Sequence, residues 1–404
     1  MEFNFYATLV SLVFVLLLGR FIVSKVGFLS YYNIPEPVVG GVIVAIGLFI
    51  FAHYFGIKLT FDASLQEPLL LAFYASIGLS ADFASLKKGG KILIVFLAVV
   101  LGLLIIQNIV GIILASLMGV NPLIGLLGGS ITMSGGHGTG AAWAKVFEAS
   151  PYHFGIADGV AMACATFGLI AGGIIGGPVA HYLMKRHKLD PKSHNKDFEN
   201  VSENIFEEPT KVRLITATSF VESLALIAIC LLCGTLIADL LHGSPFTIPT
   251  FVWCLFIGAA LRNILSASRI HHVFDREMGV LGNVSLALFL AFALMNINIL
   301  DLVSLALPMI VILVAQVVVM VLYAVFVTFR FCGRDYDACV LSAGHCGFGL
   351  GATPTAMVNM QAVTHHYGIS HMAFVIVPLV GAFFVDILNS VVISGMLLSP
   401  VFPK

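Results

Sequence analysis

Long apolar segments follow one another along almost the whole chain. A helix that crosses the hydrocarbon layer of a bilayer needs about twenty predominantly apolar residues. Apolar runs of about this length fall at ten places: 6–24, 36–55, 68–82, 92–118, 156–184, 214–242, 249–267, 278–300, 302–329 and 370–398. We therefore expect an all-α polytopic membrane protein with ten transmembrane helices.

Two glycine-rich segments interrupt this series, at 121–149 and at 338–360. Both contain the pattern Ser-x-Gly-His, with the two histidines 208 residues apart. Each glycine in a helix interior costs about 1 kcal/mol relative to alanine, so a run of glycines should break the helix. Neither segment has room for two full crossings. Each is therefore predicted to form a re-entrant hairpin, whose broken backbone must be enclosed by protein or line a wet cavity.

The basic residues predict the orientation of the helices. Loops on the cytoplasmic side normally carry an excess of Lys and Arg. If the N-terminus lies outside, 17 of the 20 basic residues fall on the inner side, and the exceptions are Lys58, Lys145 and Lys404. With ten crossings, both termini are then expected on the outer side, with the first hairpin entering from outside and the second from the cytoplasm.

A polar segment at 185–213 divides the chain into two similar parts, 1–184 and 214–404. Each part has five apolar runs and one glycine-rich segment, and Gln107 and Gln316 occupy matching places 209 residues apart. Because five crossings leave the chain on the opposite side of the membrane, the two parts must be inserted upside down relative to each other. We expect two inverted repeats joined by a cytoplasmic linker, which is a construction typical of secondary transporters.

The composition supports a membrane protein and disfavours several functions. Hydrophobic residues make up 59% of the 404 residues and charged residues 10%, whereas soluble domains carry about 25% charged residues. A net charge of -1 without a basic tract argues against a nucleic-acid partner. The glycine-rich segments lack the strand and the lysine of nucleotide-binding motifs, and no nucleophile elbow is present. We therefore expect no enzyme activity and no organic cofactor.

The expected hairpin tips favour binding of a carboxylate. A broken helix frees backbone amides, and the helix that starts after the break presents its positive dipole end. Serine and threonine hydroxyls in the same segments would add hydrogen-bond donors. The candidate substrate-binding residues are Ser134, Gly135, Gly136, His137, Gly138, Thr139, Gly140, Ser342, Gly344, His345, Gly347, Gly349, Gly351 and Thr353.

Parts of this candidate set have a second interpretation. Glycines also allow membrane helices to pack closely, without any role in binding. His137 and His345 could bind substrate or couple transport to protons, but a buried neutral histidine satisfied by a carbonyl is the commoner arrangement. Both alternatives remain open at the level of sequence.

A coupling cation would need oxygen ligands near the same breaks. An aspartate at the bilayer centre costs roughly 3 kcal/mol, so Asp386, deep in the last apolar run, should face a cavity. Together with carbonyls released by the breaks, the candidate Na⁺ ligands are Thr132, Gln316, Asp386 and Asn389. A purely structural role for Asp386, or an interhelical hydrogen bond by Gln316, is the alternative.

The chain resembles the bacterial sodium/glutamate symporter family. The resemblance runs along essentially the whole chain and rests on the motifs IPEPVVGG (34–41), GGSITMSGGHGTGAAWAK (128–145), ACATFG (163–168), LGNVSLALFLA (281–291) and GHCGFGLGATPTA (344–356). It implies Na⁺-driven uptake of glutamate across the inner membrane, paired re-entrant loops, a homodimer in membrane lipid and an elevator-type movement.

The resemblance also implies which positions carry function. Residues 134–140 and 342–351 correspond to the family's pore-loop motifs, and Asp386 and Asn389 match polar positions of its last helix. A proton-coupled or exchange carrier for another dicarboxylate or amino acid is the alternative. An ion channel with two pore loops and an intramembrane hydrolase are more distant ones.

Overall fold

The computed structural model describes residues 2–31, 34–56, 59–83, 86–189, 215–241, 248–295, 305–368 and 370–402. Most of these residues are helical, and the strands are limited to a two-residue parallel pairing of β1 (Glu2–Phe3) with β2 (Thr60–Phe61) within the described part of the chain. The α-helices are α1 (Phe5–Lys25), α2 (Gly27–Tyr31), α3 (Glu36–Phe55), α4 (Gln66–Ser80), α5 (Leu86–Leu117), α6 (Pro122–Leu126), α7 (Gly136–Glu148), α8 (Ala157–His187), α9 (Ala217–Leu240), α10 (Thr250–Ser268), α11 (Asp275–Met295), α13 (Ala306–Tyr323), α14 (Phe329–Phe331), α15 (Tyr336–Leu350), α16 (Thr353–Tyr367), α17 (His371–Leu379) and α18 (Val385–Leu397).

Four shorter helical segments connect or interrupt these helices. They are the 3-10 turn η1 (Ala63–Leu65) and the π-helical segments η3 (Leu127–Ile131), η5 (Ala324–Thr328) and η6 (Val380–Phe384). The π-segment η6 follows Pro378, which cannot donate a backbone hydrogen bond inside α17. π-Bulges of this kind are frequent at functional sites in helices.

Seven helices within the described residues are long and apolar enough to span a membrane. They are Phe5–Lys25, Gly90–Leu117, Ala157–His187, Ala217–Leu240, Thr250–Ser268, Asp275–Met295 and Ala306–Phe331. The sequence predicted ten long spans. The difference has three causes. Helix α4 has only 15 residues, and the apolar stretch of α3 covers only Glu36–Ala52. The last predicted run is divided into α17, η6 and α18. The protein is a polytopic membrane protein. Most of the predicted linker 185–213 lies outside the described residues.

Several helices begin where a side chain caps the free backbone amides. Asn121 accepts a hydrogen bond from the amide of Leu123 at the start of α6, where Pro122 takes the first helical position. Asp335 accepts from the amide of Ala338 at the start of α15. Helix starts require such partners because the first four amides have none inside the helix. The boundaries of the two glycine-rich segments are thus set partly by local capping.

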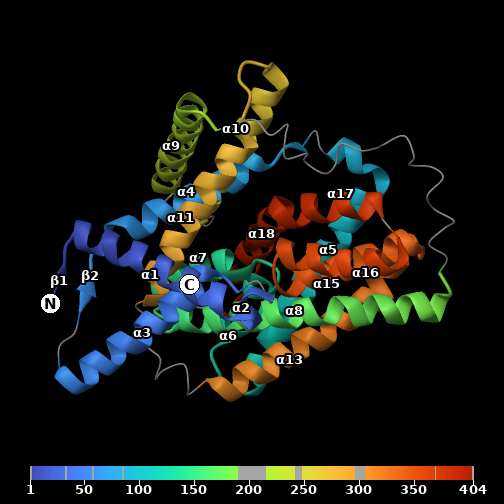
Figure 1. Cartoon of the computed structure of the whole chain (residues 1–404), viewed down its shortest axis with the longest axis horizontal. Helices are drawn as coiled ribbons and strands as arrows, with labels where there is room; N and C mark the ends of the chain where they lie inside the picture. Colours follow the sequence, from blue (N-terminus) through green and yellow to red (C-terminus); the bar gives the residue numbers. More distant parts are fainter. Residues whose placement is uncertain are drawn as a thin grey trace.

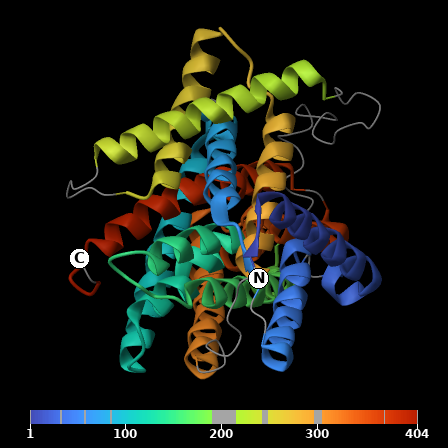
Figure 2. The same cartoon turned by 90° about the vertical axis from the view of Figure 1, so that its left-hand side faces the viewer.

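The helices pack into two groups. The first helix group consists of α1, α3, α4, α9, α10 and α11, and the second of α5, α6, α7, α8, α13, α15, α16, α17 and α18. Figure 1 shows the first group mainly on the left and at the top, with α5, α8, α13 and α15 to α17 on the right. In Figure 2, the yellow-green α9 runs across the outer side of the first group. The groups touch chiefly where α11 meets α7 and α8, where α4 meets η6 and where α10 meets α18.

Glycine allows a very close helix contact within the second group. A Cβ atom added to Gly168 of α8 would lie 2.1 Å from the carbonyl oxygen of Leu350, at the end of α15. Real Cβ atoms do not approach backbone this closely, so only glycine fits at this position. Close backbone approach of this kind is the usual role of small residues between membrane helices. It fixes α8 directly against the end of α15.

Candidate functional site

The first glycine-rich segment breaks the helix between η3 and α7. Gly129 has non-helical dihedral angles of φ -94° and ψ -140°. The carbonyl oxygen of Ser130 then accepts hydrogen bonds from the amides of Ser134, at 3.3 Å, and Gly135, at 3.1 Å. Gly136 has a φ of 66°, a left-handed conformation that favours glycine, and it starts α7. The remaining candidates His137, Gly138, Thr139 and Gly140 lie in the first turns of α7.

The second glycine-rich segment breaks only after most of its glycines, within the predicted range 338–360. Ser342, Gly344, His345, Gly347 and Gly349 lie inside the continuous helix α15, so they do not form a hairpin tip. The Ser342 hydroxyl donates to the Ala338 carbonyl at 2.7 Å, within the same helix.

Close packing explains why α15 stays helical despite its glycines. A Cβ atom on Gly347 would lie 2.4 Å from the Cα atom of Ala356 in α16. At these positions the glycines serve helix contact, which is the alternative that the sequence left open. The break itself lies at Gly351 and Ala352, which are non-helical, and Thr353 opens α16 with a proline in its first turn.

The two breaks meet in space. A Cβ atom added to Gly136 would lie 3.2 Å from the carbonyl oxygen of Gly351. The Ser134 hydroxyl lies 3.2 Å from the carbonyl oxygen of Gly349, and 2.8 Å from Oε1 of Gln107. Nε2 of Gln107 donates to the same Gly349 carbonyl at 2.8 Å. Gln107 of α5 therefore joins both glycine-rich segments.

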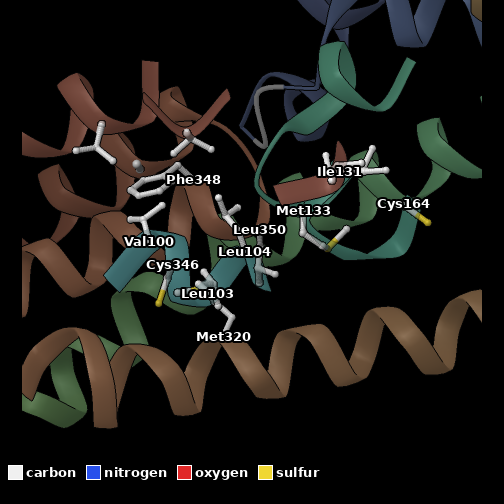
Figure 3. Close-up of a cluster of buried hydrophobic side chains, with 14 of the residues drawn as sticks. Val100, Leu103, Leu104, Ile131, Met133, Cys164, Met320, Cys346, Phe348 and Leu350 are labelled. Carbon is white, nitrogen blue, oxygen red and sulfur yellow. The ribbon is translucent and has the colours of Figure 1, made fainter. Parts of the chain in front are cut away.

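Apolar side chains surround this meeting point. Figure 3 shows Ile131 and Met133 beside the first break and Phe348 and Leu350 before the second, with buried side chains of α5 and α13 between and below them. Ile131, Met133, Phe348 and Leu350 are all buried. Broken backbone at membrane depth needs such an enclosure, because lipid cannot satisfy its polar groups.

Gln316 lies on α13 behind Gln107. Its Nε2 atom donates to the Gln107 carbonyl at 2.7 Å, so it forms the interhelical hydrogen bond that was one alternative. Its Oε1 atom is fully buried and has no hydrogen-bond partner. An unpaired buried acceptor costs about 1–3 kcal/mol. This atom is the candidate Na⁺ ligand that most clearly lacks a protein partner.

Asp386 lies on α18 and contacts the first glycine-rich segment. Its Oδ1 atom accepts a hydrogen bond from the Thr139 hydroxyl at 2.9 Å. Thr139 in turn accepts from the hydroxyl of Tyr74, on α4, at 3.1 Å. Asp386 is only partly buried. The hydrogen bond with Thr139 therefore holds one oxygen of the carboxylate.

The other two Na⁺ candidates already have partners. Asn389 exchanges two hydrogen bonds with Ser130: the Ser130 hydroxyl donates to Oδ1 at 2.5 Å, and Nδ2 donates to the Ser130 carbonyl at 2.9 Å. The amide of Ser130 donates to Asn108 at 2.8 Å. Thr132 donates to the Leu127 carbonyl at 2.6 Å. Asn389 therefore fastens the first break to α18.

The two histidines occupy different surroundings, although their motifs match. Nε2 of His137 lies 3.0 Å from the hydroxyl of Thr166 on α8, and Thr166 donates to the Met162 carbonyl at 2.8 Å. Nδ1 of His345 lies 2.9 Å from the hydroxyl of Thr328. The His345 ring packs against Phe96, Phe348 and Tyr323, and its Nε2 atom has no hydrogen-bond partner. His137 lies near the break, whereas His345 lies in an aromatic environment inside α15.

Six polar residues around the site were not among the candidates chosen from sequence. They are Tyr74, Gln107, Asn108, Ser130, Thr166 and Thr328. Ser130 follows a glycine, and Gln107 and Asn108 are adjacent amide side chains in an apolar run, so these three positions carried a usable signal. The other three sit in apolar runs, where nothing in the pattern separates them from ordinary helix residues.

Comparison with known proteins identifies the family. The family model described as sodium/glutamate symporter matches residues 1–369. The chain belongs to the sodium/glutamate symporter family. It is 56% identical to the sodium/glutamate symporters of Escherichia coli (strain K12) and Shigella flexneri over 396 residues, which is 98% of this chain and 98% of each relative. It is 50% identical to that of Haemophilus influenzae over 392 residues, or 97% and 96% of the two chains. The expected family is confirmed.

Proposed function

We propose that this protein is a secondary transporter that couples glutamate uptake to Na⁺ entry. The supporting observation is the meeting of the two breaks, where Gly136 lies against the Gly351 carbonyl and Gln107 joins both segments. The relatives, 50 to 56% identical along nearly the whole chain, are named as sodium/glutamate symporters. Transport of the same solutes by this chain is the simplest function consistent with both.

Glutamate would bind between the breaks. The start of α7 at Gly136 and the start of α16 at Thr353 present amides and the positive ends of helix dipoles. Ser134 and Thr139 add hydroxyl groups on the first break. The glycines of the set hold these backbones close together, and His137 lies one residue from the break.

Na⁺ would bind beside the substrate. Na⁺ is a hard cation that prefers oxygen ligands, and the Asp386 carboxylate and the unpaired Oε1 of Gln316 are the best candidates. Carbonyls at the end of α15 would complete a site. Thr132 and Asn389 would act mainly by holding the first break in place.

Alternating access would follow from the two helix groups. We propose inverted repeats of five crossings and one re-entrant hairpin each, with the second helix group carrying both hairpins past the first group in an elevator-type movement. The limited contact between the groups supports this division. Both termini would be periplasmic and the central linker cytoplasmic in a bacterial inner membrane. Exposed apolar side chains on α1, such as Phe14 and Leu17, would face lipid or the second subunit of a homodimer.

Uptake of labelled glutamate into vesicles that contain the purified protein tests the function. An inward Na⁺ gradient should drive accumulation, and collapse of that gradient with a Na⁺ ionophore should abolish it. An imposed proton gradient without Na⁺ is the control. Accumulation driven by protons alone, or better competition by malate than by glutamate, would favour the alternative carrier for another dicarboxylate.

A further inference from the structure

Tyr74 connects the first helix group to Asp386. It lies on α4, is fully buried, and donates its hydroxyl hydrogen to Thr139 of α7 at 3.1 Å. Thr139 donates to Oδ1 of Asp386 on α18 at 2.9 Å. The three side chains, from three helices, form a hydrogen-bond chain that we call the Tyr74 relay. No feature of the sequence pointed to Tyr74.

The direction of the relay is fixed by hydrogen counting. Tyrosine and threonine hydroxyls each have one hydrogen to donate. Thr139 gives its hydrogen to the carboxylate, so its oxygen must accept the hydrogen of Tyr74. Successive hydrogen bonds in a low-dielectric interior polarise one another, so the first bond strengthens the second. Tyr74 thereby affects Asp386 without touching it.

Aromatic packing holds the Tyr74 ring in place. Its ring centroid lies 4.6 Å from that of Phe251 on α10, and Phe251 packs edge-on against Trp143 at 5.5 Å. Trp143 lies on α7 one turn after Thr139. The ring and the relay therefore bridge the same boundary, with α4 and α10 on one side and α7 on the other.

We propose that Tyr74 is a positioning residue for the coupling cation. It orients the Thr139 hydroxyl so that one carboxylate oxygen of Asp386 is occupied and the other is left for Na⁺. Because Tyr74 belongs to the first helix group and its targets to the second, this arrangement exists only while the groups stand as they do here. The affinity for Na⁺ is then linked to the relative position of the groups. This inference rests on the proposed Na⁺-coupled transport.

Tyr74→Phe tests the relay with the smallest possible change. It removes one hydroxyl and keeps the ring contacts. A single neutral hydrogen bond contributes about 1 kcal/mol, so the Na⁺ concentration for half-maximal uptake should rise about two- to tenfold. The glutamate KM at saturating Na⁺ should change less than twofold. The matched control is Tyr323→Phe, which removes another buried hydroxyl, bonded to the Val99 carbonyl at 2.7 Å, and should leave Na⁺ activation unchanged.

Variants at Thr139 distinguish a positioning role of Tyr74 from a general loss of stability. Thr139→Ser keeps the hydroxyl and should remain sensitive to Tyr74→Phe. Thr139→Val removes it, so adding Tyr74→Phe should then have no further effect on Na⁺ activation. Non-additivity of this kind is the signature of directly coupled residues. Fully additive effects would overturn the inference.

A binding measurement completes the test without transport. In a Trp253→Phe background, Trp143 is the remaining tryptophan and lies beside the relay. Its fluorescence should titrate with Na⁺ in the purified protein, and Tyr74→Phe should raise the midpoint by the same factor as in uptake. If the native protein shows Na⁺-driven uptake but the midpoint and half-activation are unchanged by Tyr74→Phe, the positioning role is wrong. If the native protein shows no Na⁺ dependence, the proposed function fails instead.

Discussion

The two glycine-rich segments share a motif but use it differently. In the first, the break precedes the motif histidine, so Gly136 and His137 open α7. In the second, the helix runs through His345 and breaks six residues later, at Gly351. The first segment therefore presents the amino end of α7 to the meeting point, and the second presents the carboxyl end of α15 next to the amino end of α16. Opposite ends of helix dipoles favour opposite charges, so one place offers amides for an anion and carbonyls for a cation.

The largest expected effect comes from Asp386→Asn. Asp386 contacts the first segment through the hydroxyl of Thr139. Loss of the charge should raise the Na⁺ concentration for half-maximal uptake about 10- to 100-fold, because hydrogen bonds and contacts to charged groups contribute more than neutral ones. Na⁺ titration of uptake checks this, with the exposed Asp239→Asn as control. Unchanged Na⁺ activation would remove Asp386 from the site.

A second, smaller effect is expected from Gly136→Ala. Alanine in the left-handed conformation costs about 1–2 kcal/mol, and the new methyl would press on the Gly351 carbonyl. Uptake per molecule should fall about tenfold. Gly56→Ala is the matched control, because Gly56 also has a positive φ, of 68°, but open space around it. Equal losses of uptake in both variants would mean that strain alone, and not the meeting of the two breaks, is responsible.

The smallest effect distinguishes the paired serines of the motif. Ser134→Ala would leave Oε1 of Gln107 without its hydrogen-bond donor, so glutamate KM should rise about fivefold. Ser342→Ala removes only a hydroxyl bonded within its own helix, and KM should stay within about twofold. Measuring both KM values at saturating Na⁺ compares the segments directly. A larger effect at Ser342 would contradict the difference between them.

The sequence predicted the helices better than the site because the two depend on different information. Apolar runs must be helical in lipid, so helices such as α5 and α8 fall where the runs do. Glycine content is ambiguous, because it permits both a break, as at Gly136, and a close contact, as at Gly347. For this reason the sequence did not show which glycines of the second segment lie at the break and which lie inside α15. Tyr74 could not be found, because its role depends on which helix lies opposite.

Interhelical polar contacts were partly foreseeable. Gln107 and Gln316 stand out as amides within apolar runs, and the structure joins them directly. The reciprocal bonds of Asn389 with Ser130 explain why a polar side chain marked as a cation ligand can be structural. Residue type identified the polar positions. Only the hydrogen bonds in the structure show which side-chain oxygen already has a partner, as in Asn389, and which has none, as in Gln316.

The contact of Gly168 with the Leu350 carbonyl has a consequence for how such proteins diversify. The main chains of α8 and α15 lie directly against each other there, with no side chain of Gly168 between them. Substitution at this contact therefore cannot change the helix spacing in small steps. A related protein that transports a longer or shorter solute would therefore have to differ in the side chains that project from neighbouring helices. The backbone contact itself would stay the same, and the distance between α8 and the end of α15 would be fixed in all such proteins.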